Sequence, residues 1–371
     1  MKNGWRKTTI GEVCEVVNGG TPKTGVAAYW DGPHRWITPA EMGKRLSPCV
    51  DETERTLTDL GLENSSARLL PPNSVILSSR APIGHLVINA VPMATNQGCK
   101  GLIPCGEIEY KFLYYYLIGA VELLNSLGTG ATFKELSGGK LKDVSIPVAP
   151  LPEQRRIVGI LDEAFDGIAA AKANADKNLQ NARDLFQSHL NAVDGKKVPL
   201  GELVNITTGK LDANAAVADG QYPFFTCSRE VYAINEHAFD CEAILLAGNN
   251  AVGDFNVKHY EGKFNAYQRT YVITVNDKKR VLYRFLYYQM LRSLKKFKEQ
   301  SVGAGTKFLK LGIINNLEIA LPSVAEQERI ATEMDSLLEQ TDRLQSIYQQ
   351  KLAALDALKK SLLDQAFTGQ M

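Results

Sequence analysis

The chain has 371 residues, enough for two ordinary domains, and this length excludes a small protein held together mainly by disulfide bonds. Hydrophobic residues make up 44% of the chain and charged residues 22%, which is typical of a folded globular protein. The net charge of +1 conceals an uneven distribution, because residues 196–323 carry 17 basic and 12 acidic side chains whereas residues 324–371 carry 5 and 8. The basic segment favours a nucleic-acid partner, and the overall balance argues against a dedicated non-specific DNA-binding protein.

No run approaches the roughly 18 consecutive apolar residues that span a bilayer. The start of the chain is basic but lacks the apolar core of a secretory signal, so we expect a cytoplasmic protein with no membrane partner. The six cysteines contain no C-x-x-C pair and the five histidines show no metal-ligand spacing, so no metal site is expected.

Five motifs of the first half recur in the same order in the second half, which indicates an internal duplication. The pairs are TIGEV at 9–13 with PLGEL at 199–203, SVIL at 74–77 with EAIL at 242–245, YKFLYY at 110–115 with YRFLYY at 283–288, GTGATF at 128–133 with GAGTKF at 303–308, and LPEQRRI at 151–157 with VAEQERI at 324–330. The offset between the copies changes from 190 to 168 and then to 173 residues, so the halves differ by insertions in their globular parts. The sequence therefore predicts a constant frame that carries two variable domains.

Each half follows the same predicted order of elements. Short β-rich runs broken by Gly and Pro come first, and one apolar helix follows at 109–127 or 280–297. A glycine loop and a last strand at 144–148 or 317–321 then lead into a long polar helix. The predicted segments are a first domain at 1–151, a central helix at 152–195, a second domain at 196–323 and a distal helix at 324–371.

Both long helices carry residues at heptad spacing, which is typical of a coiled coil. The distal seams are Ile330, Leu337, Leu344, Lys351 and Leu358, with Met334, Thr341, Tyr348, Leu355 and Leu362. The central seams are Ile157, Ala164, Ala171 and Leu185, with Leu161, Ile168, Ala175 and Ala182. Each helix has about 40 residues and is roughly 60 Å long. We expect the helices to pair antiparallel, which would give the molecule approximate two-fold symmetry.

Two functions fit this pattern equally well. Two unequal domains on a rigid spacer can read a split, non-palindromic DNA site, with the helix length setting the gap between the half-sites. The alternative is a duplicated coiled-coil scaffold that binds proteins and has no sequence-specific DNA binding.

The order of the motifs resembles that of the specificity subunits of type I restriction-modification enzymes. The resemblance rests on the junctions LPEQRRI at 151–157 and EQERI at 326–330 and on the terminal QAFTG at 365–369, and it covers essentially the whole chain. It implies an α+β fold with two tandem pseudo-symmetric target recognition domains. Each domain would be followed by a long helix, and the two helices would form an antiparallel coiled coil.

The resemblance also implies a function without catalysis in this chain. In that family each domain binds one half of a bipartite asymmetric sequence in double-stranded DNA. The paired helices hold two methyltransferase subunits, and restriction subunits complete the complex. S-adenosylmethionine, ATP and Mg²⁺ are used by those partners, so no catalytic residue and no cofactor is expected in the chain itself.

The stretch SSRAPIG at 78–84 resembles the arginine-containing turn of that family. A loop arginine can bind guanine through two hydrogen bonds or pair with phosphate, and the alternative for Arg80 is a surface ion pair. Asn96 and Gln97 can read bases or belong to a structural hydrogen-bond network. The candidate DNA-binding residues of the first half are Thr21, Lys23, Thr38, Ser79, Arg80, Asn96, Gln97, Thr129 and Lys134.

At the corresponding turn of the second half, asparagines replace the arginine, and their amides suit adenine edges. The loop at 303–310 combines glycines with a hydroxyl and lysines that can contact phosphate. Different side chains at matching places are what two different half-sites require. The candidates of the second half are Asn249, Asn250, Gln268, Arg269, Thr306, Lys307 and Lys310.

Three further groups are given structural or minor roles. The tyrosines at 114–116 and 287–288 are assigned to the core because they lie on the most apolar helix of each half, and Trp36 is treated likewise. The basic helix end at 292–298 is a solvated face that can steer phosphate. Asp254, Glu261 and Lys263 match a metal-dependent nuclease only weakly.

Overall fold

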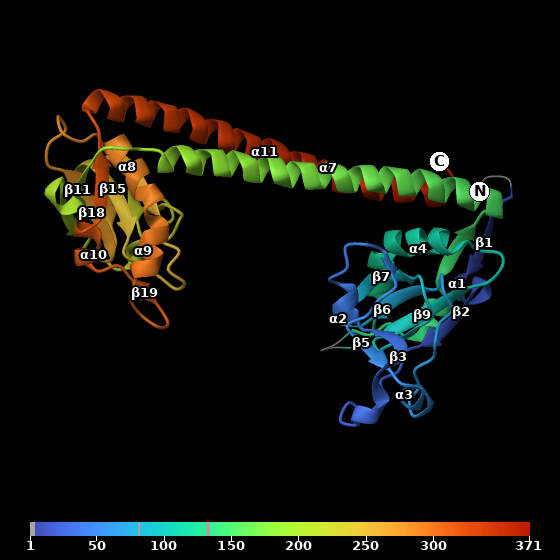
Figure 1. The fold of residues 1–371 in the computed structure, drawn as a ribbon. Coiled ribbons are helices and arrows are strands. Elements are labelled where there is room, and N and C mark those ends of the chain that lie inside the picture. Colours follow the sequence, from blue (N-terminus) through green and yellow to red (C-terminus); the bar gives the residue numbers. More distant parts are fainter. Residues whose placement is uncertain (1–3, 81, 131–133) are drawn as a thin grey trace. The chain divides into compact units, whose positions relative to one another are not determined.

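The computed structural model describes residues 4–80, 82–130 and 134–371 (Figure 1). The chain folds into two compact units, the first formed by Met1–Ala173 with Lys351–Met371 and the second by Asn174–Gln350. The division falls within both long helices, so each unit contains one mixed domain of helices and strands and a segment of each long helix. Among the described residues, no helix is long and apolar enough to cross a membrane.

The first domain contains ten strands and six short helices among its described residues. The strands are β1 (Arg6–Thr9), β2 (Cys14–Asn18), β3 (Trp30–Ile37), β4 (Cys49–Val50), β5 (Arg55–Leu57), β6 (Val75–Ser79), β7 (Ile83–Asn89), β8 (Met93–Thr95), β9 (Cys99–Pro104) and β10 (Ser145–Val148). The helices are α1 (Ile10–Val13), α2 (Pro39–Met42), α3 (Asp59–Glu63), α4 (Tyr110–Gly119), α5 (Val121–Leu127) and α6 (Gly138–Lys142), with a 3-10 turn η1 (Ala27–Tyr29). The main sheet has the strand order β2-β9-β6-β7-β4, beside a three-stranded sheet β5-β3-β8 and the pair β1-β10.

Helix α4 supplies much of the core of the first domain. Glu109 caps its first turn, because the carboxylate accepts a hydrogen bond of 2.7 Å from the Phe112 N–H. Phe112 and Leu113 are completely buried and share one apolar cluster with Val75 and Leu77 of the central strand β6. Burial of such side chains removes apolar surface from water and provides most of the stabilisation of a core of this kind.

The second domain repeats this plan with different additions. Its strands are β11 (Lys196–Pro199), β12 (Val204–Thr208), β13 (Tyr222–Phe225), β14 (Tyr232–Ile234), β15 (Phe239–Ala247), β16 (Asn249–Asn250), β17 (Val257–Ala266), β18 (Thr270–Val275), β19 (Lys307–Phe308) and β20 (Glu318–Leu321). Its helices are α8 (Tyr283–Arg292), α9 (Leu294–Gln300) and α10 (Leu311–Asn315), with 3-10 turns η2 (Leu200–Glu202) and η3 (Ala213–Ala215). The main sheet has the order β12-β18-β15-β17-β13-β14, beside the pairs β11-β20 and β16-β19.

The duplication is visible in the strand order. The run β2-β9-β6-β7 of the first domain corresponds to β12-β18-β15-β17 of the second, and β1-β10 corresponds to β11-β20. All pairs within these runs are antiparallel. The next strand also corresponds, because β4 pairs in parallel with β7 and β13 pairs in parallel with β17. The domains differ by the sheet β5-β3-β8 of the first and by β14, the edge strand of the second. The expected α+β fold with two pseudo-symmetric domains, each followed by a long helix, is confirmed.

A buried glutamine ties the first long helix, α7 (Leu151–Asn191), to the first domain. The side chain of Gln154 is completely buried. Its Nε2 donates hydrogen bonds to the carbonyl oxygens of Glu107 at 2.9 Å and Ala149 at 2.7 Å. Its Oε1 accepts a hydrogen bond of 2.8 Å from the Glu109 N–H. Every polar atom of the amide is therefore used to hold the helix start against the segment that precedes α4.

The second long helix, α11 (Val324–Thr368), is fixed in the same way. Gln327 is also completely buried. Its Nε2 donates to the carbonyl oxygens of Arg280 and Pro322, and its Oε1 accepts from the Leu282 N–H, each at 3.0 Å. The glutamine of each junction motif is thus a structural residue that joins a domain to its helix.

An aspartate two turns further along each long helix makes a second matched contact. In the first unit, Asp162 accepts hydrogen bonds from Lys111 Nζ at 2.6 Å and from the Tyr115 hydroxyl at 2.5 Å. Burial and the hydrogen bond to Asp162 raise the pKa of the Tyr115 phenol well above its ordinary value. The tyrosine is therefore a buried donor, and its predicted place in the core is confirmed.

The second unit carries the same arrangement with arginine in place of lysine. Asp335 accepts hydrogen bonds from the Arg284 guanidinium and, at 2.5 Å, from the hydroxyl of the completely buried Tyr288. Burial raises the pKa of the Asp335 carboxyl, but hydrogen bonds from Arg284 and Tyr288 outweigh it and leave the pKa below its ordinary value. Two independent contacts thus fix the start of each long helix on its domain.

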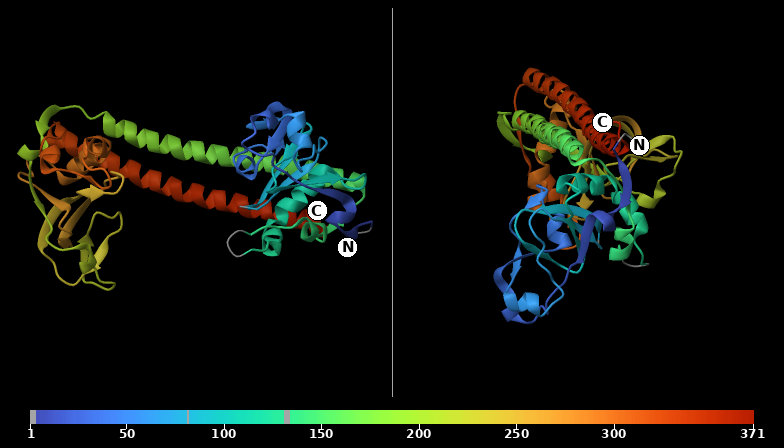
Figure 2. Two further views of the ribbon diagram at one scale, coloured as in Figure 1. Left: turned by 90° about the horizontal axis from the view of Figure 1, so that it is seen from below. Right: turned by 90° about the vertical axis from the view of Figure 1, so that its right-hand side faces the viewer.

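The segments of α7 and α11 run antiparallel within each unit, side by side in Figure 2. Residue numbers that rise along α7 fall along α11 at successive contacts. These contacts join Phe165 to Lys359 and Lys172 to Asp356 in the first unit, and Arg183 to Gln345 and His189 to Glu333 in the second. The predicted antiparallel pairing is confirmed within each unit.

One predicted seam of α11 is correct along its length, and the other is correct at Ile330 and Leu337 but is displaced by one residue further along. The row Met334, Thr341, Tyr348, Leu355 and Leu362 is buried or half-buried. In the other predicted row, Leu344 is 38% exposed, Leu358 is 48% exposed and Lys351 is exposed. Their places are taken by the half-buried residues that follow them, Gln345, Leu352 and Lys359. The second seam therefore lies four residues after the first and not three.

In α7 the predicted row Leu161, Ile168, Ala175 and Ala182 is buried or half-buried. In the other predicted row, Ile157, Ala164 and Ala171 are buried or half-buried. The predicted place of Leu185 on this seam is wrong, because its side chain is 52% exposed. The neighbouring Phe186 takes its place, with its ring centroid 6.3 Å from that of Tyr288 on α8. The helix face that meets the second domain is set by this aromatic contact.

Candidate nucleic-acid interface

Three predicted residues of the first domain form one hydrogen-bonded group. The Thr21 hydroxyl bonds to the side-chain oxygen of Gln97, and Asn96 Nδ2 donates to Thr21 Oγ1 at 3.3 Å. The loop that carries Thr21 is anchored by Trp36, whose Nε1 donates to the Gly20 carbonyl oxygen at 2.9 Å. Trp36 is 3% exposed, so its predicted place in the core is confirmed. A buried indole thus holds a polar loop at the surface.

The other polar residues of this region differ in their freedom to reach a ligand. Lys23 and Gln97 are exposed, and Asn96 is half-buried with its Oδ1 accepting a hydrogen bond of 2.6 Å from the Gly98 N–H. Thr38 is the N-cap of α2, where its hydroxyl accepts a hydrogen bond of 3.3 Å from the Glu41 N–H. Thr38 therefore has a structural task that the sequence motif did not reveal.

Arg80 lies directly after the central strand β6 and is half-buried. It forms an isolated bridge with Glu135, whose Oε2 lies 3.7 Å from Arg80 Nη1. The two side chains are 36% and 44% exposed, so the guanidinium is partly neutralised but remains accessible. The two alternatives for Arg80 are therefore not exclusive, since an exposed ion pair can open when a base edge is offered.

Ser79 requires a correction. It is the last residue of β6 and is completely buried, and its Oγ donates to the Gly98 carbonyl oxygen at 3.1 Å. All five residues of β6 are buried, with Val75 and Leu77 in one apolar cluster and Ile76 in another, so both faces of the strand are covered. Contact between Ser79 and DNA would require the strand to move, so Ser79 is a structural residue.

A lysine that was missed lies beside Arg80. Lys100 on β9 is 6% exposed. Burial lowers the pKa of its ammonium group, and the nearby Glu135 carboxylate opposes that shift. From sequence alone, a lysine in a strand is ordinarily expected to face solvent. The charged neighbours Arg80 and Glu135, which come from other parts of the chain, place Lys100 in the same polar group.

The glycine loop of the first domain brings Thr129 and Lys134 to the surface, where both are exposed. Two backbone hydrogen bonds of 3.0 and 2.9 Å between Thr129 and Glu135 close the loop next to Arg80. Residues 131–133 of the motif, and Ala81 of the arginine turn, lie outside the described residues.

In the second domain, β16 carries both predicted asparagines. The side-chain oxygen of Asn250 accepts hydrogen bonds from the N–H groups of Val252 at 2.9 Å and Asp254 at 3.1 Å, so it shapes the following turn. The side-chain oxygen of Asn249 is buried and has no hydrogen-bond partner among the described residues. Asn250 can therefore offer its Nδ2 to a base without breaking the turn.

Lysines gather around Gly253 in this turn. A Cβ at that position would lie 3.2 Å from Lys298 Cγ and 3.4 Å from Lys307 Cγ, and the φ of +73° is one that glycine adopts readily. Arg229 and Asp254 form an exposed ion pair of 2.6 Å beside it. The sequence missed Arg229 because it comes from the loop after β13, distant in the chain.

Gln268 and Arg269 lie at the positions that match Gln97 and Gly98, and both are exposed. Gln268 Nε2 donates to Asp212 of the early loop, as Gln97 bonds to Thr21 in the first domain. The Arg269 guanidinium lies 5.2 Å from the ring centroid of Phe308. Each domain therefore repeats one contact, a hydrogen bond between an exposed glutamine, Gln97 or Gln268, and a side chain of an early loop.

The remaining candidates of the second domain lie on the glycine loop. Thr306 and Lys307 are half-buried, and Lys310 is exposed just before α10. Lys307 pairs with Asn250 through β19 and β16. The structure therefore brings Asn249, Asn250, Arg269 and Lys307 together.

A metal-dependent nuclease finds no support in the arrangement of the described residues. Asp254 is engaged by Arg229, and Glu261 and Lys263 lie on the long strand β17. Within residues 4–80, 82–130 and 134–371, no group of three His, Cys, Asp or Glu side chains is placed to hold a metal ion.

The chain is similar to known proteins over nearly its whole length. The family described as the type I restriction modification DNA specificity domain matches residues 2–178 and 192–353. The specificity subunit of the type I restriction enzyme EcoDI from Escherichia coli is 45% identical over 48% of this chain and 39% of that subunit. The MjaIX specificity subunit from Methanocaldococcus jannaschii is 25% identical over 99% of this chain and 93% of that subunit. The chain thus matches well under half of the first relative and nearly all of the second.

Two solved structures share the fold. A chain from a type I R-M system, studied for complex assembly and conformational transition, has a TM-score of 0.77 at 19% identity, covering 99% of this chain and 98% of that one. The HsdS subunit from Thermoanaerobacter tengcongensis has a TM-score of 0.61 at 17% identity, covering 100% and 98%.

Proposed function

Because the chain belongs to the family of type I restriction-modification DNA specificity domains, we propose that it selects the DNA sequence for such a system. It reads a bipartite, asymmetric site in double-stranded DNA, with one half-site for each domain. It performs no chemistry itself and acts as the sequence-reading part of a larger complex.

One observation carries this proposal: a repeated frame ends in different polar side chains. The strands β2-β9-β6-β7 and β12-β18-β15-β17 have the same order, so their ends are comparable positions. The first domain presents Arg80 beside Glu135 there, and the second presents Asn250 with Arg269. A scaffold that binds two copies of one protein would favour the same side chains twice. Two different half-sites require different ones.

The exposed groups suit recognition in the DNA grooves. Arg80 can donate two hydrogen bonds to O6 and N7 of guanine, and the Asn250 amide group can donate to adenine N7. Lys134, Lys307 and Lys310 offer charge to phosphates, which sets register without reading sequence. The combination of few base-reading groups and modest positive charge suits a selective reader.

The partners proposed for this chain are two methyltransferase subunits and the restriction subunits of the same system. The methyltransferases take the target adenine out of the helix and methylate it with S-adenosylmethionine, and the restriction subunits use ATP and Mg²⁺. The long helices α7 and α11 expose apolar side chains such as Leu185 and Leu344, which gives those subunits a surface to bind.

Methylome mapping tests this proposal. DNA is sequenced from cells that express the chain alone, the methyltransferase subunit encoded with it alone, and both together. Methyladenine at one split, asymmetric motif only when both are present is the expected result. A stable complex of the two proteins without any new methylated motif would contradict the proposal and favour the duplicated protein-interaction scaffold.

A further inference from the structure

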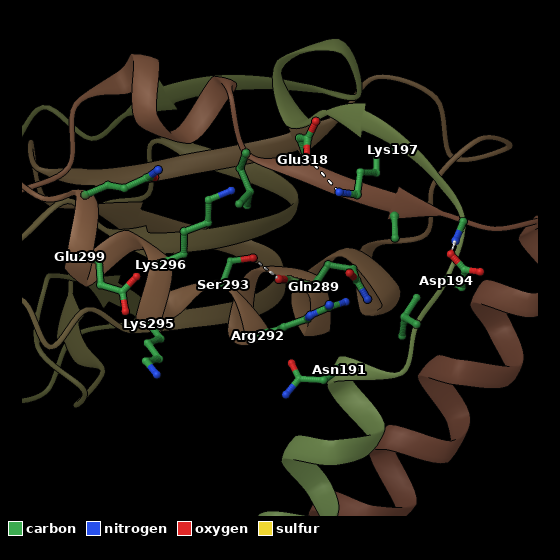
Figure 3. Close-up of a pocket in the computed structure, with 15 residues that line it drawn as sticks. Asn191, Asp194, Lys197, Gln289, Arg292, Ser293, Lys295, Lys296, Glu299 and Glu318 are labelled. Carbon is green, nitrogen blue, oxygen red and sulfur yellow. Dashed lines mark hydrogen bonds and ion pairs between the residues drawn. The ribbon is translucent and has the colours of Figure 1, made fainter.

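A cavity of about 680 Å³ lies in the second unit between the end of α7, helices α8 and α9, and the strand pair β11-β20 (Figure 3). Three basic side chains on its wall come from one stretch of helix, Arg292 at the end of α8 and Lys295 and Lys296 at the start of α9. Lys295 and Lys296 follow Arg292 by three and four residues, so each is a neighbour of Arg292 on the helix surface. Gln289, which is 3% exposed, forms part of the lining one turn earlier.

The positive charge of this wall is only partly balanced. Lys197 is matched by Glu318 at 3.5 Å, and Asp194 Oδ1 accepts a hydrogen bond of 2.8 Å from the Gly195 N–H. In the described part of the chain, none of Arg292, Lys295 and Lys296 has an ion pair or a side-chain hydrogen bond. Glu299 is the remaining acidic residue of the wall. The wall thus carries four basic and three acidic side chains, and three of the cations have no ion-pair partner among the described residues.

The corresponding place in the first unit is closed. Phe367 of α11 fills it, with its ring centroid 4.9 Å from Phe112 and 5.3 Å from Tyr116. In the second half α7 ends at Asn191, and the residue after it that packs against the core of the domain is the smaller Val193. Tyr116 is matched by Gln289. The opening is therefore a property of the second half and not a consequence of the shared fold.

The charge at this place also differs between the halves. The position of Lys295 is occupied in the first half by Glu122, which pairs with Lys360 at 3.2 Å. An acidic, paired side chain thus stands where the second half has an unpaired lysine. The second half alone combines an open cavity with positive charge.

Helix α9 connects this cavity to the turn that follows Asn250 and contains Gly253 in the same domain. It has seven residues, and its last basic residue, Lys298, lies against Gly253 beside Lys307. Seven helical residues span about 10 Å, and the phosphates of one DNA strand are spaced about 3.4 Å along the duplex axis. A strand whose bases meet the turn therefore passes the cavity after roughly three phosphates.

We propose that this cavity binds backbone phosphates of the DNA immediately beside the half-site read by the second domain. The inference rests on the proposed function and adds to it a phosphate clamp that the first domain lacks. Arg292, Lys295 and Lys296 donate to the phosphate oxygens, and Glu299 limits the strength of the site.

Ethylation interference on the complete complex tests the clamp, because it reports which phosphates are needed for binding. The probe is a duplex that carries the motif found by methylome mapping. The variant combines Arg292→Ala, Lys295→Ala and Lys296→Ala in the full chain together with its methyltransferase subunits. Loss of interference at one group of about two to four phosphates within roughly five nucleotides of one half-site is expected, with the other half-site unchanged. Affinity falls about tenfold and the slope of log K against log salt becomes shallower by about 2 to 3.

Two further variants sharpen the test. Lys177→Ala, Lys263→Ala and Lys279→Ala together remove the same charge from exposed sites of the same unit that do not line the cavity. This control keeps the interference pattern. Glu299→Gln removes the opposing carboxylate and tightens binding severalfold, which a merely structural role for the residue would not produce. Thermal unfolding confirms that each variant is folded.

An unchanged interference pattern in the triple Ala variant, with normal affinity, overturns the clamp. Stabilisation of the wild-type chain but not of the triple variant by inorganic phosphate, together with unchanged DNA binding, would show a site for free phosphate and also overturn it. If the wild-type complex shows no sequence preference, the proposed function itself fails. These results are distinguishable because the first two require a sequence-specific wild-type complex.

Discussion

The two domains agree where each meets its long helix and differ where each presents polar side chains to solvent. Gln154 and Gln327 make the same three hydrogen bonds, and Asp162 and Asp335 each hold a buried tyrosine and a cation. The strand ends carry an arginine with a glutamate in one domain and asparagines with lysines in the other. Such a division indicates that the helix attachments serve the frame, which is needed twice, whereas the tips serve two different targets.

The largest effect is expected at the buried glutamines. Gln154→Leu and Gln327→Leu each leave one buried N–H and two buried carbonyl oxygens without partners, which costs about 3–5 kcal/mol of unfolding free energy. Denaturant unfolding measures it. Gln180→Leu, at an exposed site of the same helix as Gln154, is the matched control and changes stability by less than about 0.5 kcal/mol. A large loss in one half and none in the other would break the claim that the two attachments are equivalent.

The next effect separates the two halves. Phe367→Ala removes a ring that packs on Phe112 and Tyr116, and it lowers the unfolding free energy of the first unit by about 2–4 kcal/mol. Asp194→Ala, on the wall of the cavity in the second half, changes stability by less than about 0.5 kcal/mol. Thermal unfolding followed in each unit checks both values. Equal losses at the two positions would contradict the difference between a closed and an open site.

A smaller effect concerns recognition and leaves the fold intact. Arg80→Ala weakens binding to the cognate site by roughly 1–3 kcal/mol and relaxes the preference at one base pair of the first half-site. Glu135→Gln frees the guanidinium and strengthens binding to all sequences, because the carboxylate no longer competes with the DNA. Equilibrium binding to duplexes with single base changes measures both. Unchanged affinity and preference in the Arg80→Ala variant would remove this residue from the interface.

The smallest stability change is expected on the outer face of α11. Leu358→Gln replaces a leucine that is 48% exposed and alters unfolding free energy by less than about 0.5 kcal/mol. Leu355→Gln, three residues earlier on the seam, costs about 1–2 kcal/mol because the side chain faces α7. Circular dichroism during thermal unfolding checks the pair. The opposite order would restore the seam predicted from the sequence.

The duplicated motifs carried enough information for the architecture, because repeated motifs at fixed order imply repeated elements. The heptad spacing also gave the seam through Met334, Tyr348 and Leu355, which are buried or half-buried. The second seam was wrong at Leu344 and Leu358 because the residues covered there, Gln345 and Lys359, are polar and do not stand out in a hydrophobic pattern. Only packing against the facing helix decides which of two neighbouring side chains is covered.

The candidate interface was predicted less completely than the fold. Arg80 and Gln97 were found because they stand in recognisable turns. Ser79 was wrongly included because the sequence does not show that β6 is central and buried on both faces. Lys100 and Arg229 were missed because their neighbours come from distant parts of the chain. Tertiary contacts, which a single sequence does not display, decide these cases.

Exchange of one domain tests the central claim most directly. Residues 1–151 are replaced by the corresponding first domain of another family member with a known target, and the methylome of cells expressing this chain with its methyltransferase subunit is mapped. The expected result is a motif in which one half changes to that of the donor and the other half stays as in the original. A motif that stays unchanged in both halves, or changes in both, would contradict the assignment of one half-site to each domain.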